Sequence, residues 1–119
     1  MKNTDWLYHY KARVTGAYDG DTITVEIDLG LKTFVKGEKL RLNRINAPEV
    51  RGDEKVAGKA SRDWLRERIL GKEIIIETFK DKRGKYGRYL GEVWLEEDGQ
   101  FVNINDELVE RGFAEYKEY

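Results

Sequence analysis

The chain has 119 residues, of which 22 are basic and 23 are acidic, and its formal net charge is −1. This length predicts a single domain, residues 1–119, with one hydrophobic core. A net charge so close to zero gives no general attraction to a polyanion, so binding to nucleic acid would have to come from a local patch. The chain contains no cysteine, which excludes disulfides, zinc–thiolate centres and thiol catalysis.

The N-terminal residues lack the charged and apolar segments of an export signal, and no apolar run is long enough to cross a bilayer. We therefore expect a cytoplasmic monomer that does not contact membranes. The single histidine, His9, would have to serve alone in any histidine-based centre, so we expect a structural or exposed role for it.

Three strands are predicted in the first half of the chain. Residues 22–29 alternate apolar and polar side chains, which is typical of a strand with one buried face. Residues 7–18 are rich in Tyr, Val and Thr and lead into Asp19-Gly20, a strong signal for a tight turn between two strands. Residues 34–45 predict a third strand, which ends before the next proline because proline cannot donate to a sheet.

Residues 54–70 change to the spacing of an amphipathic helix, with charged residues opposite an apolar stripe. Gly71 is placed to cap the C-terminus of this helix. The residues expected to form the stripe are Val56, Ala60, Trp64, Leu65 and Ile69.

The second half of the chain ends with further strands and a short helix. Asp98-Gly99 predicts a second hairpin turn, and residues 103–111 predict a helix that Gly112 stops. The strands are predicted at residues 74–76, 89–95 and 101–102.

This order of elements predicts an α+β fold that is mainly β. The expected architecture is a five-stranded OB-type Greek-key barrel, with a helix between strands 3 and 4 and a C-terminal helix. An SH3-like barrel with helical insertions is the alternative. An OB barrel presents a groove that suits single-stranded nucleic acid.

Asp21 is the first candidate for chemistry, because it opens the strand 22–29 at the expected rim of the barrel. A carboxylate that a rigid backbone holds in such a place is a natural ligand for a hard cation such as Ca²⁺ or Mg²⁺. Asp19 is explained by its place in the turn. For Asp21 alone, an ordinary turn carboxylate is the alternative interpretation.

Residues 46–49, Asn-Ala-Pro-Glu, form the exit from the third strand. A kinked exit can direct the Asn46 amide oxygen, the Ala47 carbonyl and the Glu49 carboxylate the same way, and calcium accepts all three types of oxygen. A glutamate beside a metal can also take a proton from water as the general base of a hydrolysis. The alternative is a plain strand exit with a solvated glutamate.

Two arginines complete the candidate site. Arg41 lies on the polar face of the third strand, and Arg88 follows a Tyr-Gly pair. Guanidinium groups match phosphate oxygens in pairs, and in a cleft they stabilise the charge that grows on a transferring phosphoryl group. Taken singly, either is better explained as one of many surface cations.

Four segments in this order carry a family resemblance: residues 18–22 (Tyr-Asp-Gly-Asp-Thr), 40–49, 85–88 (Lys-Tyr-Gly-Arg) and 102–114. Together they span nearly the whole chain, and on them the chain resembles the thermonuclease-like (micrococcal nuclease) family. The resemblance implies an OB barrel with helices and a Ca²⁺-dependent phosphodiesterase that acts on DNA and RNA.

The resemblance also implies a set of metal ligands and a base. Asp21 matches the first metal ligand, Asn46 stands where the family usually has an aspartate, and Ala47 matches a ligand that binds through its carbonyl. Glu49 matches the base that activates water. One Ca²⁺ ion is implied, with Mg²⁺ or Mn²⁺ as alternatives.

The remaining matches concern the substrate, which is DNA or RNA. Arg41 and Arg88 match the arginines that hold the phosphate and its transition state. Tyr86 resembles a tyrosine of the phosphate pocket, Lys85 beside it is assigned to substrate binding, and Asp19 is an outer carboxylate of the metal site.

The chain departs from the family pattern in two places. Asn46 replaces a charged ligand by a neutral one, which lowers the expected affinity for calcium. The family often stacks a tyrosine on a base near the C-terminus, and both Tyr116 and Tyr119 are candidates for that role.

Two functions follow from these residues. The first is an active metal-dependent nuclease, favoured by the combination of Glu49 with both arginines. The second is an OB module that binds nucleic acid or a peptide without cutting, favoured by Asn46 and the low net charge. A basic rim on the loop 50–59, from Arg51, Lys55 and Lys59, would fit either function. The preference for DNA or RNA and for internal or terminal cleavage stays open.

Overall fold

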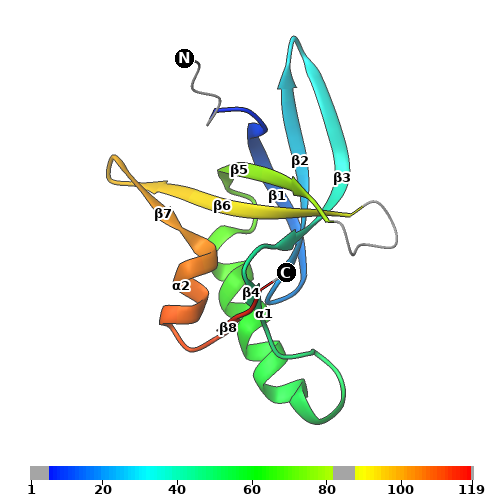
Figure 1. Ribbon diagram of the computed structural model, residues 1–119, viewed down its shortest axis with the longest axis vertical. Coiled ribbons are helices and arrows are strands. Elements are labelled where there is room, and N and C mark those ends of the chain that lie inside the picture. The colour runs from blue at the N-terminus through cyan, green and yellow to red at the C-terminus, as the bar shows by residue number, and fades with distance from the viewer. Residues whose placement is uncertain (1–5, 82–87, 119) are drawn as a thin grey trace.

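The computed structural model describes residues 6–81 and 88–118 of the chain (Figure 1). Its helices are α1 (Lys55–Ile69) and α2 (Ile104–Glu110), and a 3₁₀ turn, η1 (Gly52–Glu54), precedes α1. Its strands are β1 (His9–Asp19), β2 (Thr22–Gly30), β3 (Thr33–Leu42), β4 (Ile45–Asn46), β5 (Glu73–Lys80), β6 (Tyr89–Glu97), β7 (Gln100–Asn103) and β8 (Glu115–Tyr116).

Five strands close into a barrel in the order β3-β2-β1-β5-β6, because β3 also pairs with β6, in parallel. The other neighbours in the barrel are antiparallel. With α1 before the fourth barrel strand and α2 near the C-terminus, this confirms the OB-type barrel of the α+β, mainly β, class. Gly91 lies in the closing pair, where a side chain would overlap Leu40, so the closure depends on a glycine.

The core lies inside the barrel and beneath α1, which crosses the lower end of the barrel in Figure 1. Neither helix in the described part of the chain is both long and apolar enough to span a membrane. The largest fully buried side chains are Ile23, Leu40, Leu42, Ile45, Leu65, Ile69, Ile74, Ile76, Ile104, Leu108, Val14 and Val25.

The predicted turns and caps are confirmed. Asp98 (φ 52°) and Gly99 (φ 81°) both adopt the left-handed conformation that a tight hairpin between β6 and β7 requires. Gly71 (φ 77°) and Gly112 (φ 81°) have the same conformation directly after the helices, as expected for C-terminal caps.

The prediction of one continuous strand over residues 34–45 was wrong. β3 ends at Leu42, and the next pair, Ile45–Asn46, forms β4 with the C-terminal strand β8 instead of extending the barrel. Arg44 causes the break, because its φ of 68° turns the chain out of the extended conformation. The Lys117 amide donates to the Arg44 carbonyl at 2.8 Å and so ties this turn to the C-terminal segment.

The predicted apolar stripe of α1 is also wrong in its first half, because Val56 is 85% exposed and Ala60 is exposed as well. The buried line runs instead through Gly58 and Ser61 to Leu65 and Ile69. The buried residues in this half of the helix, Gly58 and Ser61, are smaller than the apolar residues that the pattern predicted. They are small because this end of α1 packs directly against backbone.

Gly58 marks the closest of these approaches. A side chain at this position would overlap the carbonyl group of Glu49, so α1 rests on the backbone of the segment after β4. The Ser61 hydroxyl, one turn further, donates to the Phe113 carbonyl at 2.7 Å. The helix therefore fixes two segments that are far apart in the sequence.

An ion cluster around the buried Glu92 holds the segment after β3 against α2. The Glu92 carboxylate is 6% exposed and accepts from the Arg44 guanidinium at 2.9 and 2.6 Å and from Asn103 at 3.1 Å. Arg44 also donates to Asp106 at 2.9 Å. The hydrogen bonds to Glu92 are the main reason that the pKa of Arg44 rises above its ordinary value.

Gly58→Ala tests the contact between α1 and the segment after β4. Replacing glycine by alanine inside a helix ordinarily stabilises a protein by about 0.5–1 kcal/mol. Here we expect a loss of about 1–3 kcal/mol, because the new methyl group must displace backbone. Urea denaturation measures the change, with Ala60→Gly on the exposed side of the same helix as a control for helix propensity. A more stable Gly58→Ala protein would contradict the close approach.

Arg44→Met tests the ion cluster. Removing the guanidinium leaves the Glu92 carboxylate buried with one remaining donor, Asn103, so we expect a loss of about 1–3 kcal/mol of unfolding free energy. The double variant Arg44→Met/Glu92→Met should recover most of that loss, since no buried charge then remains. Equal losses in the single and double variants would show that the charge pair is not what stabilises this segment.

Candidate functional site

Most of the predicted site residues line one open cleft of about 660 Å³. The walls come from the end of β1, the turn into β2, the end of β3, the segment after β4, and the residue before β6. The residues that line the cleft are Gly16, Ala17, Tyr18, Asp19, Asp21, Thr22, Thr24, Lys39, Arg41, Asn46, Glu49, Arg66 and Arg88.

Asp21 lies at the bottom of the cleft, in the two-residue turn between β1 and β2, and is only 6% exposed. The Asp19 carboxylate shapes this turn by accepting the Asp21 amide at 3.1 Å. The Asp21 carboxylate in turn accepts the Ala47 amide at 2.8 Å. One side chain therefore fixes the relative positions of the β1–β2 turn and the segment after β4.

Gly20 allows this turn to sit so deeply. A Cβ atom at Gly20 would lie 2.7 Å from the Cβ of Ser61 and 2.9 Å from the Cβ of Ala47, distances that packed carbon atoms do not reach. The turn is thus wedged between α1 and the segment after β4. Any larger residue would push Asp21 out of the cleft floor.

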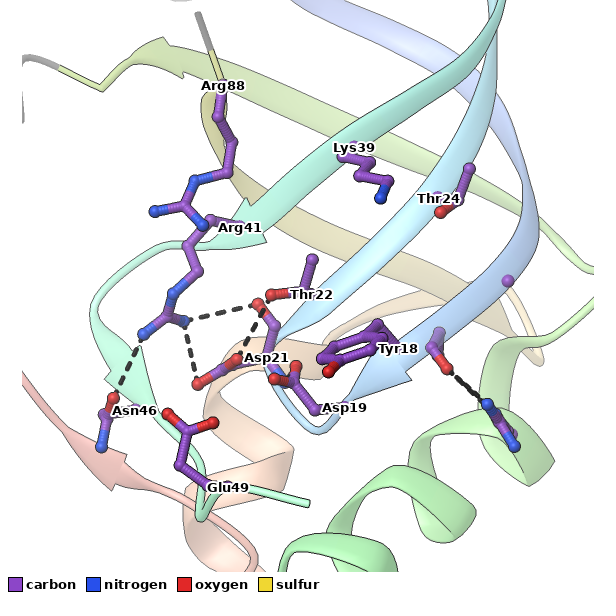
Figure 2. A pocket seen from close by; sticks show the side chains of 13 residues that line it. Tyr18, Asp19, Asp21, Thr22, Thr24, Lys39, Arg41, Asn46, Glu49 and Arg88 are labelled. Atoms are coloured by element: carbon purple, nitrogen blue, oxygen red, sulfur yellow. Dashed lines mark hydrogen bonds and ion pairs between the residues drawn. The ribbon is translucent and has the colours of Figure 1, made fainter. Parts of the chain in front are cut away.

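Arg41 extends from β3 across the cleft and is 9% exposed. One terminal nitrogen lies 3.1 Å from Asp21 Oδ2 and 3.2 Å from the Ile45 carbonyl, and the other donates to Asn46 Oδ1 at 3.2 Å (Figure 2). The predicted phosphate-binding arginine therefore bridges two of the predicted metal ligands. A single positive charge stands where the Asp21 and Asn46 oxygens converge.

The ionisation of Asp21 is unusual. Burial raises the pKa of its carboxyl to about 7, and a hydrogen bond with Asp19 adds to the rise. The ion pair with Arg41 acts in the opposite direction, but the loss of hydration outweighs it. Because the pKa is raised in the folded state, the ionised carboxylate lowers stability as the pH rises from about 4 toward 7. A cation that binds this carboxylate would offset that cost.

Glu49 lies on the segment after β4 and points toward the same space as Asp21 and Asp19 (Figure 2). Its side chain is exposed, as a group that exchanges protons with water must be. Its backbone is held firmly, because its amide donates to the Glu54 carboxylate at 3.2 Å and its carbonyl rests against Gly58. The position of this carboxylate is thus set by η1 and α1.

Arg88 enters the cleft from the opposite side, just before β6 (Figure 2). Its side chain is 43% exposed, and its guanidinium lies 3.6 Å from the Asp81 carboxylate. Lys85 and Tyr86, which the sequence assigns to the substrate, lie outside the described residues. The cleft therefore brings together Asp21, Asn46 and the three predicted catalytic residues, whereas the predicted ligand Ala47 is buried and does not line it.

Comparison with known proteins agrees with this arrangement. The family model described as "Staphylococcal nuclease homologue" matches residues 39–119, which is more than half of the chain. The chain belongs to the staphylococcal nuclease homologue family. This confirms the family predicted from the four sequence segments.

Relatives in this family include proteins named as nucleases. The chain is 30% identical over 110 residues to the thermonuclease of Staphylococcus hyicus, covering 90% of this chain and 59% of that one. It is 34% identical over 115 residues to an endonuclease of Bacillus subtilis, covering 88% of this chain and 9% of that protein. An uncharacterized protein of Methanocaldococcus jannaschii is 28% identical over 129 residues, covering 89% and 58% of the two chains. The chain thus spans less than two thirds of the relatives' length.

The predicted donor set consists of oxygen atoms, which suits a hard cation, but it carries little negative charge. The predicted ligands are the Asp21 carboxylate, the Asn46 amide oxygen and the Ala47 carbonyl, and all three would bind through oxygen. Among residues 6–81 and 88–118, no three or more His, Asp or Glu side chains form a metal-binding group. The bridging guanidinium shows that Asp21 and Asn46 converge on one cationic position. A metal ion there would have to displace Arg41.

The other aromatic and basic candidates lie elsewhere. The Tyr116 hydroxyl donates to Asp106 at 3.0 Å beside the Arg44 cluster, and Tyr119 lies outside the described residues. His9 stacks on Trp94 on another face, in line with a structural role. The loop cations Arg51, Lys55 and Lys59 are absent from the lining of the cleft.

Sequence reasoning missed part of the cleft lining. Tyr18, Thr24, Lys39 and Arg66 all line it, although none was assigned a role. Lys39 was detectable, since it stands two residues before Arg41 and alternate residues of a strand face the same side. Arg66 was not, because only the docking of α1 brings it to the cleft.

Asn46→Asp tests whether Asn46 takes part in cation binding. A second carboxylate at this position should tighten calcium binding by about tenfold or more, because calcium affinity rises with ligand charge. Isothermal titration calorimetry and the calcium-induced rise in Tm measure the effect without relying on activity. Asn43→Asp adds the same charge outside the cleft and should leave calcium affinity nearly unchanged. Equal effects of both substitutions would exclude Asn46 as a ligand.

Proposed function

We propose that this domain is a calcium-dependent nuclease that hydrolyses phosphodiester bonds of DNA or RNA. The observation that carries the proposal is the meeting of Glu49, Arg41, Arg88 and Asp21 around one open cleft, although they come from four separate segments. Nuclease names among the relatives support the same activity.

The cleft supplies the groups that phosphodiester hydrolysis requires. Glu49 accepts a proton from water, and the resulting hydroxide forms a new P–O bond while one ester P–O bond breaks in line with it. Arg41 and Arg88 donate hydrogen bonds to the phosphoryl oxygens, whose negative charge grows as the reaction proceeds. The departing alkoxide is protonated by solvent, since Arg88 and the cleft mouth are open to water.

Asp21, Asn46 and Ala47 would hold the cation in this scheme. When bound, Ca²⁺ supplies Lewis-acid polarisation of a phosphoryl oxygen. Asp21 is the only acidic side chain of the set and is buried, so it would anchor the cation to the barrel. Arg41 must leave Asp21 and Asn46 to reach a phosphate, so cation binding and arginine release are linked.

A non-catalytic module that binds nucleic acid or a peptide is the second candidate. The observation that favours it is the bridge from Arg41 to Asp21 and Asn46, which already satisfies these groups without a metal. Metal dependence separates the two functions, because a binding module should hold an oligonucleotide in EDTA and leave it intact.

Glu49→Gln is the decisive variant. Purified protein should cleave labelled single-stranded DNA when calcium is raised into the millimolar range and should not cleave it in EDTA. Loss of the general base should lower the cleavage rate by about 10²–10⁴-fold. Glu73→Gln, an exposed glutamate at the start of β5, should cleave like the wild type. If wild-type protein and the Asn46→Asp variant both fail to cleave at every calcium concentration, the binding module is the correct function.

A further inference from the structure

We propose that Tyr18, Thr24 and Lys39 form a second nucleotide subsite, which binds the nucleotide next to the one at the scissile phosphate. The inference rests on the proposed function and deepens it, because it assigns as the ligand a single-stranded nucleic acid whose backbone runs along β3 and whose base lies toward β1. The cleft extends beyond the catalytic groups onto these three residues, and nothing in the proposed hydrolysis uses them.

The strand register places two parallel rows of side chains on the cleft face. In the first row, Thr22 pairs with Asp19 on one side and with Arg41 on the other. In the second row, Thr24 pairs with Gly16 on β1 and with Lys39 on β3. The second row thus repeats the pattern of the first, with a hydroxyl at the centre and a cation on β3.

The spacing of the rows fits a nucleic acid backbone. Arg41 and Lys39 are two residues apart on one strand, a rise of about 6.6 Å, which is close to the separation of successive phosphates in an extended single strand. If Arg41 holds the scissile phosphate, Lys39 is placed for the next one. Figure 2 shows Lys39 and Thr24 on the side of the cleft away from Asn46 and Glu49.

Tyr18 supplies a surface for the base. The pairing of β1 with β2 shifts register between Ala17 and Asp19, so Tyr18 lies in a bulge with no partner on β2. Bulges redirect side chains, and Tyr18 is 53% exposed and lines the cleft. Arg66 donates twice to the Ala17 carbonyl, at 3.0 and 2.8 Å, and so fixes the backbone beside the ring. An exposed, rigidly mounted aromatic ring is a typical stacking platform for a base.

The subsite has a definite end. One row further along β2, Glu26 faces the same side as Thr22 and Thr24, since alternate residues of a strand share a face. Glu26 pairs in register with Arg13 on β1, and neither residue lines the cleft, so the cleft ends at the second row. The arrangement therefore predicts room for one additional nucleotide beyond the scissile phosphate on this side.

Binding of thymidine oligonucleotides to the Glu49→Gln protein tests the subsite without cleavage. With calcium present, we expect affinity to rise about 5- to 50-fold at one added nucleotide, as base stacking and a phosphate contact together would give, and to level off after it. Lys39→Ala and Tyr18→Ala should each reduce this step, and Tyr18→Phe should retain it. Lys39→Ala should also lower the slope of log affinity against log salt by about 0.7.

Lys32→Ala is the matched control, because Lys32 lies in the β2–β3 turn outside the cleft and should leave the step in place. Circular dichroism confirms that each variant is folded. A step that survives both Lys39→Ala and Tyr18→Ala would overturn the subsite, whatever the cleavage assay shows. A Lys39-dependent step in a protein that never cleaves would uphold the subsite and reject the nuclease proposal.

Discussion

The site depends on one buried carboxylate. Asp21 connects the β1–β2 turn to the segment after β4 through the Ala47 amide, and it draws the Arg41 guanidinium across the cleft. Burial makes this carboxylate costly to ionise, and a cation beside it lowers that cost. In this structure the cation is Arg41. The same electrostatic demand that positions the arginine also makes the position attractive to a metal ion.

Helix α1 fixes the positions of the segments that carry Asp21 and Glu49. The packing leaves no room for a side chain at Gly20 or at Gly58. The Ser61 hydroxyl, also on α1, donates to the Phe113 carbonyl. The turn that carries Asp21 and the segment that carries Glu49 are therefore pressed against one rigid element. Chemistry that needs a carboxylate placed to within a fraction of an ångström is served by such packing better than by a free loop.

Much of the fold could be predicted from the sequence, because alternation, turns and caps are local signals. The hairpin turn at Asp98 and the cap at Gly71 both need a left-handed backbone conformation. Few residue types adopt it readily, so their presence in the sequence marks these positions. The break at Arg44 could not be predicted, since a buried Glu92 from a distant strand stabilises it. The exposure of Val56 had the same origin, because the buried face of α1 is chosen by the backbone it meets at Gly58.

The candidate site was predictable as a set of residues, but the state of Arg41 was not. A sequence pattern assigns Arg41 to a phosphate and Asn46 to a metal, whereas in the structure the two side chains bond to each other. The neutral amide has two consequences for this bond. It holds the guanidinium less tightly than a carboxylate would, because the attraction between opposite charges is missing. In the proposed calcium site it would also weaken the attraction for the ion. In the proposed nuclease, Asn46 would therefore lower both the affinity for the metal and the cost of releasing Arg41 to a substrate phosphate.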